Sequence, residues 1–249
     1  MDSSPLPFGS APNGSLPVWY PVLLDLRGRD CLVVGGGVIG ARKAEALLQS
    51  GARVKLVSRE VGPEVVRLDA LRSEMTVIVR AYETADLANI WFVVTAIDDP
   101  AVTAQIKVEA DERRIWMNAA DDPTNCSVIL PAVHRDGDVI VAVSTGGTSP
   151  ATAAWLRDWV ADQFGSMPGR LAEEISRVRD RVRKFRSSEG LPWNALVGSL
   201  ATVISSNDGS TDPGAIATAT NEWLIANCRS EVCVSCSTNC RAMEPASGF

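Results

Sequence analysis

The 249-residue sequence has a single histidine and no apolar run that approaches the length of a membrane span. Its N-terminus has no basic segment followed by an apolar one, the pattern of a secretory signal, so we expect a cytoplasmic protein. Its six cysteines fit that expectation, because thiols in a reducing compartment more often bind metal than pair. With one imidazole in the chain, a carboxylate is the main candidate for proton transfer.

The chain also lacks a net positive charge. Its formal charge of −6 argues against nucleic acid as the main partner, because nucleic-acid binding needs a basic surface. The composition is ordinary for a globular protein, and the length allows one large domain or two small ones. Residues 1–17 are rich in Ser, Pro and Gly, and we expect them to be disordered.

The clearest motif starts at a short apolar run, Cys31–Val34, which is typical of a fully buried parallel strand. Gly35, Gly37 and Gly40 follow it at the spacing of a dinucleotide fingerprint, and a helical pattern then runs to Leu48. The first glycine permits a tight turn, the second lets the backbone approach a pyrophosphate, and the third lets helix and strand pack closely. The phosphates would bind the N–H groups at the positive end of the helix. We therefore predict a cofactor site that includes Gly35, Gly36, Gly37, Val38, Ile39 and Gly40.

The residues after the expected second strand, Val54–Val57, bear on which dinucleotide binds. Such sites often have an acidic residue there that holds the ribose hydroxyls. Here the residues are Ser58, Arg59 and Glu60. Glu60 suits NAD, whereas Arg59 suits the 2′-phosphate of NADP, and we predict NAD.

Strands and helices alternate through the first half of the chain. A short strand is expected at Tyr20–Leu26, further strands at Val77–Arg80, Trp91–Ala96 and Ile115–Asn118, and helices at Glu64–Arg72 and Ala101–Arg113. This alternation predicts an α/β fold with a Rossmann-like, doubly wound parallel sheet. Thr95 and Ala96 end the fourth strand at the edge where ligands bind, so we add them and Asn118 to the cofactor site.

The pattern changes after the fifth strand. Two strand-like runs, Ser127–Ala132 and Asp138–Ser144, are separated by a turn that holds His134, which we interpret as an exposed loop residue. The second run is too apolar for an exposed edge, so we expect another subunit or a sheet extension to cover it. Helices are expected over Ala151–Phe164, Arg170–Arg186, Pro192–Ser205 and Asp212–Asn227, which makes the final third a helical domain.

Two segments of this region could bind an anion. Hydroxyls and glycine amides of Ser144–Pro150 precede a helix, and plain helix capping is the alternative to anion binding. The helix Arg170–Arg186 carries six arginines and one lysine. These residues form either a solvated face or a basic surface for a polyanionic substrate.

Five segments stand out in combination: Tyr20–Gly37, Ala41–Ala44, Thr95–Ala96, Asn118–Asp121 and Ala142–Pro150. Together they resemble the precorrin-2 dehydrogenase family, the part of siroheme synthase that makes sirohydrochlorin and in some members inserts iron. The resemblance implies an NAD-binding Rossmann domain, a central dimerisation segment and a small helical domain, and hence a homodimer that acts on a tetrapyrrole. The implied reaction passes a hydride from precorrin-2 to NAD and releases a proton.

The resemblance also assigns a catalytic carboxylate, the Asp three residues after the Asn that ends the fifth strand. That position is Asp121, which would accept a proton or orient the ring, and help to remove pyrrole protons during metal entry. Its neighbour Asp122 we interpret as the residue of an Asx turn. Because precorrin-2 carries many carboxylates, we predict that it is bound by Ser144, Thr145, Gly146, Gly147 and Ser149.

Four cysteines lie close together near the end of the sequence: Cys228, Cys233, Cys236 and Cys240. Soft ligands at such spacing suit zinc or an iron–sulfur cluster, and unliganded reduced thiols are the alternative. Cys31 is expected to pack inertly in the core. For Cys126, close to Asp121, we weigh a minor metal-handling role and do not favour it.

These expectations divide the chain into a disordered 1–17, a Rossmann domain at 18–126, a dimerisation segment at 127–165, a helical domain at 166–227 and a cysteine-rich 228–249. The leading hypothesis is a precorrin-2 dehydrogenase, with ferrochelatase activity as an addition. An alternative is an NAD-binding module that senses redox state or metal through its cysteines. Asp121 and the Ser144–Pro150 loop count against a sensor, which needs neither. A third, a dehydrogenase of a small metabolite, has no dedicated substrate motif.

Overall fold

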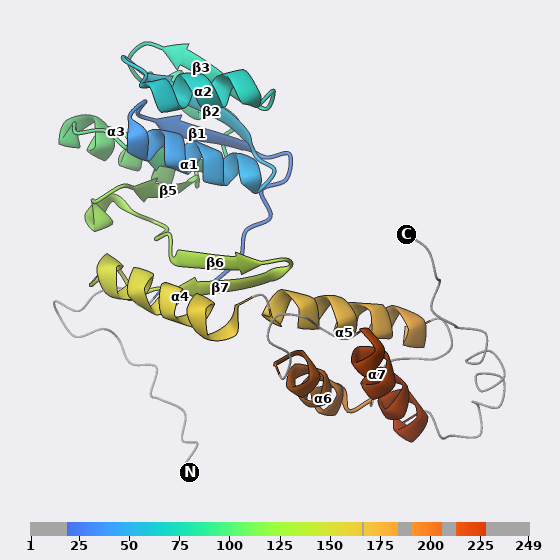
Figure 1. The fold of residues 1–249 in the computed structure, drawn as a ribbon. Coiled ribbons are helices and arrows are strands. Elements are labelled where there is room, and N and C mark those ends of the chain that lie inside the picture. Colours follow the sequence, from blue (N-terminus) through green and yellow to red (C-terminus); the bar gives the residue numbers. More distant parts are fainter. Residues whose placement is uncertain (1–18, 166, 184–190, 206–212, 228–249) are drawn as a thin grey trace. The chain divides into compact units, whose positions relative to one another are not determined.

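The computed structural model describes residues 19–165, 167–183, 191–205 and 213–227 (Figure 1). Its contacts divide the chain into two units, Met1–Pro131 with Ser144–Pro150, and Ala132–Val143 with Ala151–Phe249. None of the helices described is both long and apolar enough to cross a bilayer. The segments 1–17 and 228–249, with the four C-terminal cysteines, lie outside the described residues.

The first unit contains a five-stranded parallel sheet with the order β3-β2-β1-β4-β5. Its strands are β1 (Asp30–Val34), β2 (Arg53–Ser58), β3 (Met75–Val79), β4 (Phe92–Thr95) and β5 (Trp116–Ala119). The central strands β1 and β4 are almost fully buried, as their continuous apolar runs require. The predicted doubly wound, Rossmann-like sheet is confirmed.

Helices cover both faces of this sheet (Figure 1). On one face lie α1 (Val38–Gln49) and α2 (Pro63–Leu71), and on the other lies α3 (Pro100–Glu112). The connection between β3 and β4 contains only a 3-10 turn, η1 (Thr84–Leu87). Each face has its own apolar core, because successive strand residues point to opposite sides of the sheet.

The second unit consists of a hairpin and helices. Its elements are β6 (Ala132–Asp136), β7 (Val139–Val143), α4 (Pro150–Phe164, with Pro150 itself in the first unit), α5 (Met167–Arg183), α6 (Trp193–Ser205) and α7 (Pro213–Asn227). The strands β6 and β7 pair antiparallel, and Asp136 of the hairpin accepts a hydrogen bond of 2.6 Å from the backbone N–H of Gly169. A separate apolar core contains Val178 and Val182 of α5 with residues of α6 and α7.

Two predicted strands are wrong. The described residues from Trp19 to Leu26 form no strand, and Tyr20 and Leu23 are 87% and 75% exposed, because no neighbouring strand pairs with them. The run predicted at Ser127–Ala132 is also not a strand, since β6 begins only at Ala132. His134 consequently lies within β6 and is half-buried, so its interpretation as an exposed loop residue is wrong.

The segment after the sheet protects an edge instead of forming a strand. Ser127 and Val128 both donate backbone hydrogen bonds to the carbonyl of Met117, at 2.9 and 3.0 Å, and the Ser127 hydroxyl accepts one of 2.7 Å from the Met117 N–H. These bonds satisfy groups on the open side of β5, an edge strand. The 3-10 turn η2 (Pro123–Asn125) precedes this segment and connects it to β5.

Candidate active site

The glycine turn between β1 and α1 is built by close backbone contacts. Gly35 has φ of +124°, and a Cβ there would lie 2.2 Å from the carbonyl oxygen of Ala96. A Cβ on Gly36 would lie 2.3 Å from the Glu60 carbonyl oxygen, and one on Gly40 would lie 2.0 Å from that of Gly35. The tight turn predicted at Gly35 and the close packing predicted at Gly40 are therefore present.

Gly37 differs from its neighbours because a Cβ there would meet no atom within 4 Å. It is the N-cap of α1 and provides no side-chain cap, while Val38 and Ile39 in the first turn are 57% and 44% exposed. The first N–H groups of a helix have no acceptor within the helix, and they lie at its positive end. This open, uncapped helix start fits a pyrophosphate, although the role of each residue in binding stays a prediction.

Most of the predicted cofactor residues lie at one edge of the sheet. In the order β3-β2-β1-β4-β5, the strands β2 and β3 are added on one side of β1, and β4 and β5 are added on the other side. Ligands of open α/β sheets bind at this switch in strand order, between β1 and β4. The glycine turn follows β1, and Thr95 and Ala96 end β4 beside it, with the Ala96 N–H donating to the Val34 carbonyl at 2.8 Å. Ser58, Arg59 and Glu60 follow β2, and Arg59 and Glu60 are exposed.

Asn118 has a different environment from the other predicted cofactor residues. It is 6% exposed, and its side-chain amide donates hydrogen bonds to the Val128 carbonyl at 3.0 Å and to the Cys126 sulfur at 3.6 Å. The amide thus anchors the segment that follows β5. A contact of Asn118 with the cofactor stays a prediction.

Asp121 lies in the turn directly after β5, where its φ is +59°. Its side chain is exposed, and within the described part of the chain its carboxylate makes no hydrogen bond or ion pair. Asp122 is engaged by contrast, because its carboxylate accepts hydrogen bonds from the side-chain amide of Asn125 at 2.6 Å and from the Asn125 N–H at 3.4 Å. Asp122 therefore caps the 3-10 turn η2 through the N–H three residues on, instead of forming the predicted Asx turn, and Asp121 is left open for chemistry.

Two residues near Asp121 have surroundings that the sequence did not predict, Lys43 and Cys126. Lys43 is half-buried on α1, and its pKa is lowered by burial and by Arg42, whereas Asp121 and Cys126 raise it. The Cys126 thiol contacts backbone atoms on both sides of Asp121. Lys43 belongs to one of the segments that carry the family resemblance, and the effect of Asp121 on its pKa follows only from the fold.

The Ser144–Pro150 loop bonds mainly to itself. The Thr145 hydroxyl accepts from the Ser149 N–H at 3.0 Å, the Thr148 hydroxyl donates to the Thr145 carbonyl at 2.7 Å, and the Ser144 hydroxyl accepts from the Gly146 N–H at 3.1 Å. Gly146 and Gly147 have φ of +66° and +92°. The helix α4 begins at Pro150, one residue before the predicted start, and both helix capping and substrate binding by this loop stay predictions.

The basic residues of α5 are partly neutralised within the second unit. Arg177 pairs with Glu173 and Glu174, and the guanidinium of Arg179 lies 5.5 Å from the ring centre of Trp193. These contacts favour a solvated helix face over a dedicated polyanion surface.

The described residues contain no group of three or more His, Cys, Asp or Glu side chains that could hold a metal ion. Burial raises the pKa of the Cys31 thiol to about 12, which agrees with an inert core residue. The cysteines proposed as metal ligands, from Cys228 to Cys240, lie outside the described ranges and stay untested.

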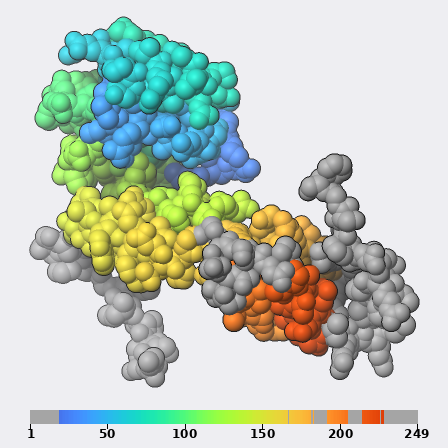
Figure 2. Space-filling model, viewed as in Figure 1, coloured from blue at the N-terminus to red at the C-terminus, as the bar shows by residue number. Residues whose placement is uncertain are grey.

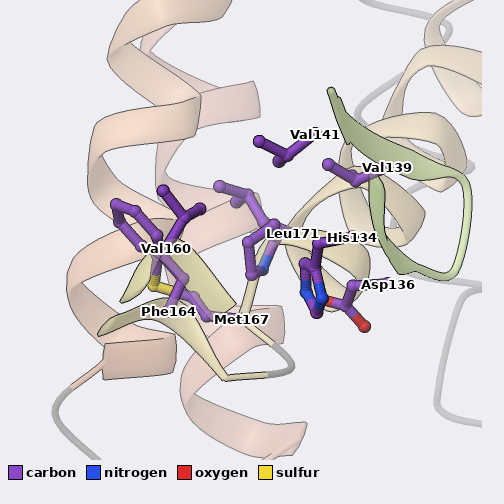
Figure 3. Close-up of a pocket in the computed structure, with 9 residues that line it drawn as sticks. His134, Asp136, Val139, Val141, Val160, Phe164, Met167 and Leu171 are labelled. Carbon is purple, nitrogen blue, oxygen red and sulfur yellow. The ribbon is translucent and has the colours of Figure 1, made fainter. Parts of the chain in front are cut away.

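A hollow of about 200 Å³ lies in the second unit, between the hairpin and the helices α4 and α5. Its lining is formed by His134, Asp136, Val139, Val141, Val160, Phe164, Met167, Pro168 and Leu171. Figure 3 shows the His134 ring beside the Asp136 side chain. Because the lining is mostly apolar, this hollow does not suit a substrate with many carboxylates.

The comparisons with known proteins agree with this geometry. Residues 22–132 match a family described as "Putative NAD(P)-binding". A siroheme synthase of Citrobacter koseri is 37% identical over 170 residues, which are 68% of this chain and 37% of that protein. One of Pseudomonas entomophila is 37% identical over 187 residues, 74% of this chain and 40% of that protein. The chain thus matches only about two fifths of the length of these relatives.

A solved structure, SirC precorrin-2 dehydrogenase, shares the fold over a wider range. Its TM-score is 0.64 at 26% identity, and the match covers 84% of this chain and 98% of that one. The chain is therefore a relative of siroheme synthases and of a precorrin-2 dehydrogenase, built around an NAD(P)-binding Rossmann domain.

Proposed function

We propose that the chain catalyses the NAD-dependent dehydrogenation of precorrin-2 to sirohydrochlorin, a step of siroheme biosynthesis. The observation that carries this proposal is the structural likeness to SirC precorrin-2 dehydrogenase, because it extends over 98% of that enzyme's chain. The identity of 37% with siroheme synthases over 68% of this chain supports the same assignment.

The cofactor, when bound, supplies an acceptor for the hydride that leaves the macrocycle. The N–H groups at the start of α1 bind its pyrophosphate, and the open space at Gly37 leaves room for the approach. Glu60 accepts hydrogen bonds from the adenosine ribose, which favours NAD. Arg59 is equally exposed beside it, so NADP is the alternative that an assay must compare.

Asp121 accepts the proton that the macrocycle loses as its conjugation extends. Its exposed position at the cofactor edge of the sheet, with no hydrogen bond in the described part of the chain, supports this role. The Ser144–Ser149 loop belongs to the same unit and binds substrate carboxylates through its glycine amides and hydroxyls.

An anaerobic absorbance assay tests the proposed reaction. Incubation of the protein with precorrin-2 and NAD should give the spectra of NADH and sirohydrochlorin, and a parallel incubation with NADP should be slower. A flat trace with both cofactors would contradict the proposal and favour the NAD-binding sensor.

Ferrochelatase activity and metal binding by the C-terminal cysteines stay predictions. Insertion of iron into sirohydrochlorin would use the same Asp121 carboxylate to remove pyrrole protons, and a chelation assay on sirohydrochlorin tests it. Zinc or an iron–sulfur cluster at Cys228, Cys233, Cys236 and Cys240 is tested by metal analysis of anaerobically purified protein. A cytoplasmic location likewise remains an expectation from the sequence.

A homodimer is supported by exposed apolar side chains in the second unit. On α4, Trp155 and Trp159 are 63% and 48% exposed, and Phe164 is 47% exposed; α4 lies in the yellow surface of Figure 2. On the hairpin, Val133 and Ile140 are each 37% exposed. A two-stranded hairpin is marginally stable alone, so a second subunit that covers these side chains would stabilise it.

A further inference from the structure

The Cys126 sulfur bridges the two ends of the turn that carries Asp121. The Cys126 thiol accepts hydrogen bonds from the Ala119 N–H at 3.2 Å and from the Asn118 amide at 3.6 Å. It is also within donor distance of two carbonyl oxygens, that of Ala119 at 3.3 Å and that of Asp122 at 3.4 Å. These contacts join the end of β5 to the residue after Asp121, so the thiol spans the turn on both sides of the carboxylate.

The backbone of Asp121 needs such support. Its φ of +59° lies in the left-handed region, which a residue other than glycine adopts at a cost unless the surrounding structure imposes it. The carboxylate has no hydrogen bond of its own in the described residues, so its direction is set by this backbone conformation. The conformation is held by the Cys126 thiol, by the Asn125–Asp122 bonds and by two backbone hydrogen bonds. The Asp122 N–H donates to the Ala119 carbonyl at 3.4 Å, and the Ala120 N–H donates to the Thr95 carbonyl at 2.8 Å.

We propose that Cys126 is a positioning residue for Asp121 in the dehydrogenation. The thiol holds the turn, and the turn fixes where the Asp121 carboxylate lies relative to the cofactor edge of the sheet. This inference rests on the proposed function for its kinetic consequence. It assigns no redox or metal role to Cys126, because burial raises the pKa of the thiol and keeps it a neutral hydrogen-bonding group.

Substitutions at Cys126 separate positioning from folding and from cofactor binding. We expect Cys126→Ala to lower kcat on the order of a hundredfold, because small misplacements of a reacting group have effects of that size. Cys126→Ser, which retains a hydroxyl, should recover part of the loss. The KM for NAD and the affinity for NADH should stay at the wild-type values in both variants, since the glycine turn is untouched.

The exchange rate of the Ala119 amide hydrogen gives a readout that does not depend on turnover, because that N–H donates to the thiol. The rate should rise in Cys126→Ala and return towards the wild-type value in Cys126→Ser, while exchange of the core amides stays unchanged. An unchanged exchange rate, or an unchanged kcat in folded Cys126→Ala, would overturn the proposal. If wild-type protein forms no NADH from precorrin-2 while Ala119 exchange still rises in Cys126→Ala, the proposed function fails and the structural role of the thiol survives.

Discussion

The glycines of the cofactor turn are required for different steric reasons. Gly35 and Gly40 have no room for a side chain, because a Cβ at either position would lie within 2.2 Å or 2.0 Å of a backbone oxygen. Gly37 has ample room in the protein alone. We therefore infer that Gly37 is required for cofactor binding rather than for folding. Substitution of Gly37 can distinguish these two requirements.

We predict that Gly37→Asp abolishes NAD binding and leaves the thermal stability at or above that of the wild type. Asp is a favourable N-cap residue, and the structure gives its side chain space, so the helix should tolerate it. The new carboxylate would, however, occupy and repel the pyrophosphate position. NADH fluorescence titration and thermal melting test this, and unchanged affinity would refute the placement of the cofactor.

For Asp121 the informative substitution is Asp121→Asn. Asn tolerates a positive φ as well as Asp does, so the turn should persist while the proton acceptor is lost. We expect kcat to fall about 10²–10⁴-fold with normal NAD affinity. Asp122→Asn, which keeps an oxygen to cap η2, is the control and should be nearly as active as wild type. Near-normal turnover of Asp121→Asn would remove this residue from the mechanism.

At the scale of elements, the buried strands were predictable because their apolar runs reflect burial on both faces. The missed elements depend on partners that lie far away in the sequence. Tyr20–Leu26 has a strand-like composition but nothing pairs with it, and Ser127–Val128 is used to cover the edge of β5. The role of Cys126 could not be predicted either, because its contacts with Asn118 and Ala119 depend on how the chain turns back after β5.

The short β3–β4 connection depends on Asp86, which is 2% exposed. Arg80 donates two hydrogen bonds of 2.8 Å to its carboxylate, and the Glu83 N–H donates one of 3.0 Å. Burial raises the pKa of Asp86, but these hydrogen bonds outweigh burial, so the pKa lies below its ordinary value of 3.8. The ionised Asp86 therefore stabilises the folded state above that value, and this stabilisation is lost as the pH falls through the folded-state pKa.

Asp86→Asn should reduce the free energy of unfolding by about 2–3 kcal/mol near neutral pH, the scale of hydrogen bonds to a charged group. The difference from wild type should shrink as the pH falls below about 4. Urea denaturation at both pH values measures it, and an equal loss at both would contradict the ionic account. Glu83→Gln is the control, because that carboxylate is 62% exposed in its ion pair with Arg80 and should contribute little.

At the scale of the whole molecule, the exposed tryptophans of α4 bear on assembly. We predict that the double substitution Trp155→Glu and Trp159→Glu gives a monomer in sedimentation experiments, whereas the wild type is a dimer. Val108→Glu alters a side chain that is 59% exposed on α3 of the first unit and should leave the dimer intact. A wild-type monomer would refute the homodimer.

The cysteine-rich segment 228–249 is predicted to be separate from the dehydrogenation. A chain that ends at Asn227 keeps the glycine turn, Asp121 and the Ser144–Ser149 loop, which all belong to the first unit. Its turnover of precorrin-2 should therefore equal that of the full chain. Loss of turnover with an intact fold would place these cysteines in the active site.

The most direct test of the account is the stoichiometry of the reaction under anaerobic conditions. If hydride passes from the macrocycle to a nicotinamide at the glycine turn, each sirohydrochlorin formed must be accompanied by one NADH, and Gly37→Asp must form neither. Sirohydrochlorin that appears without NADH, or at the wild-type rate in Gly37→Asp, would contradict it.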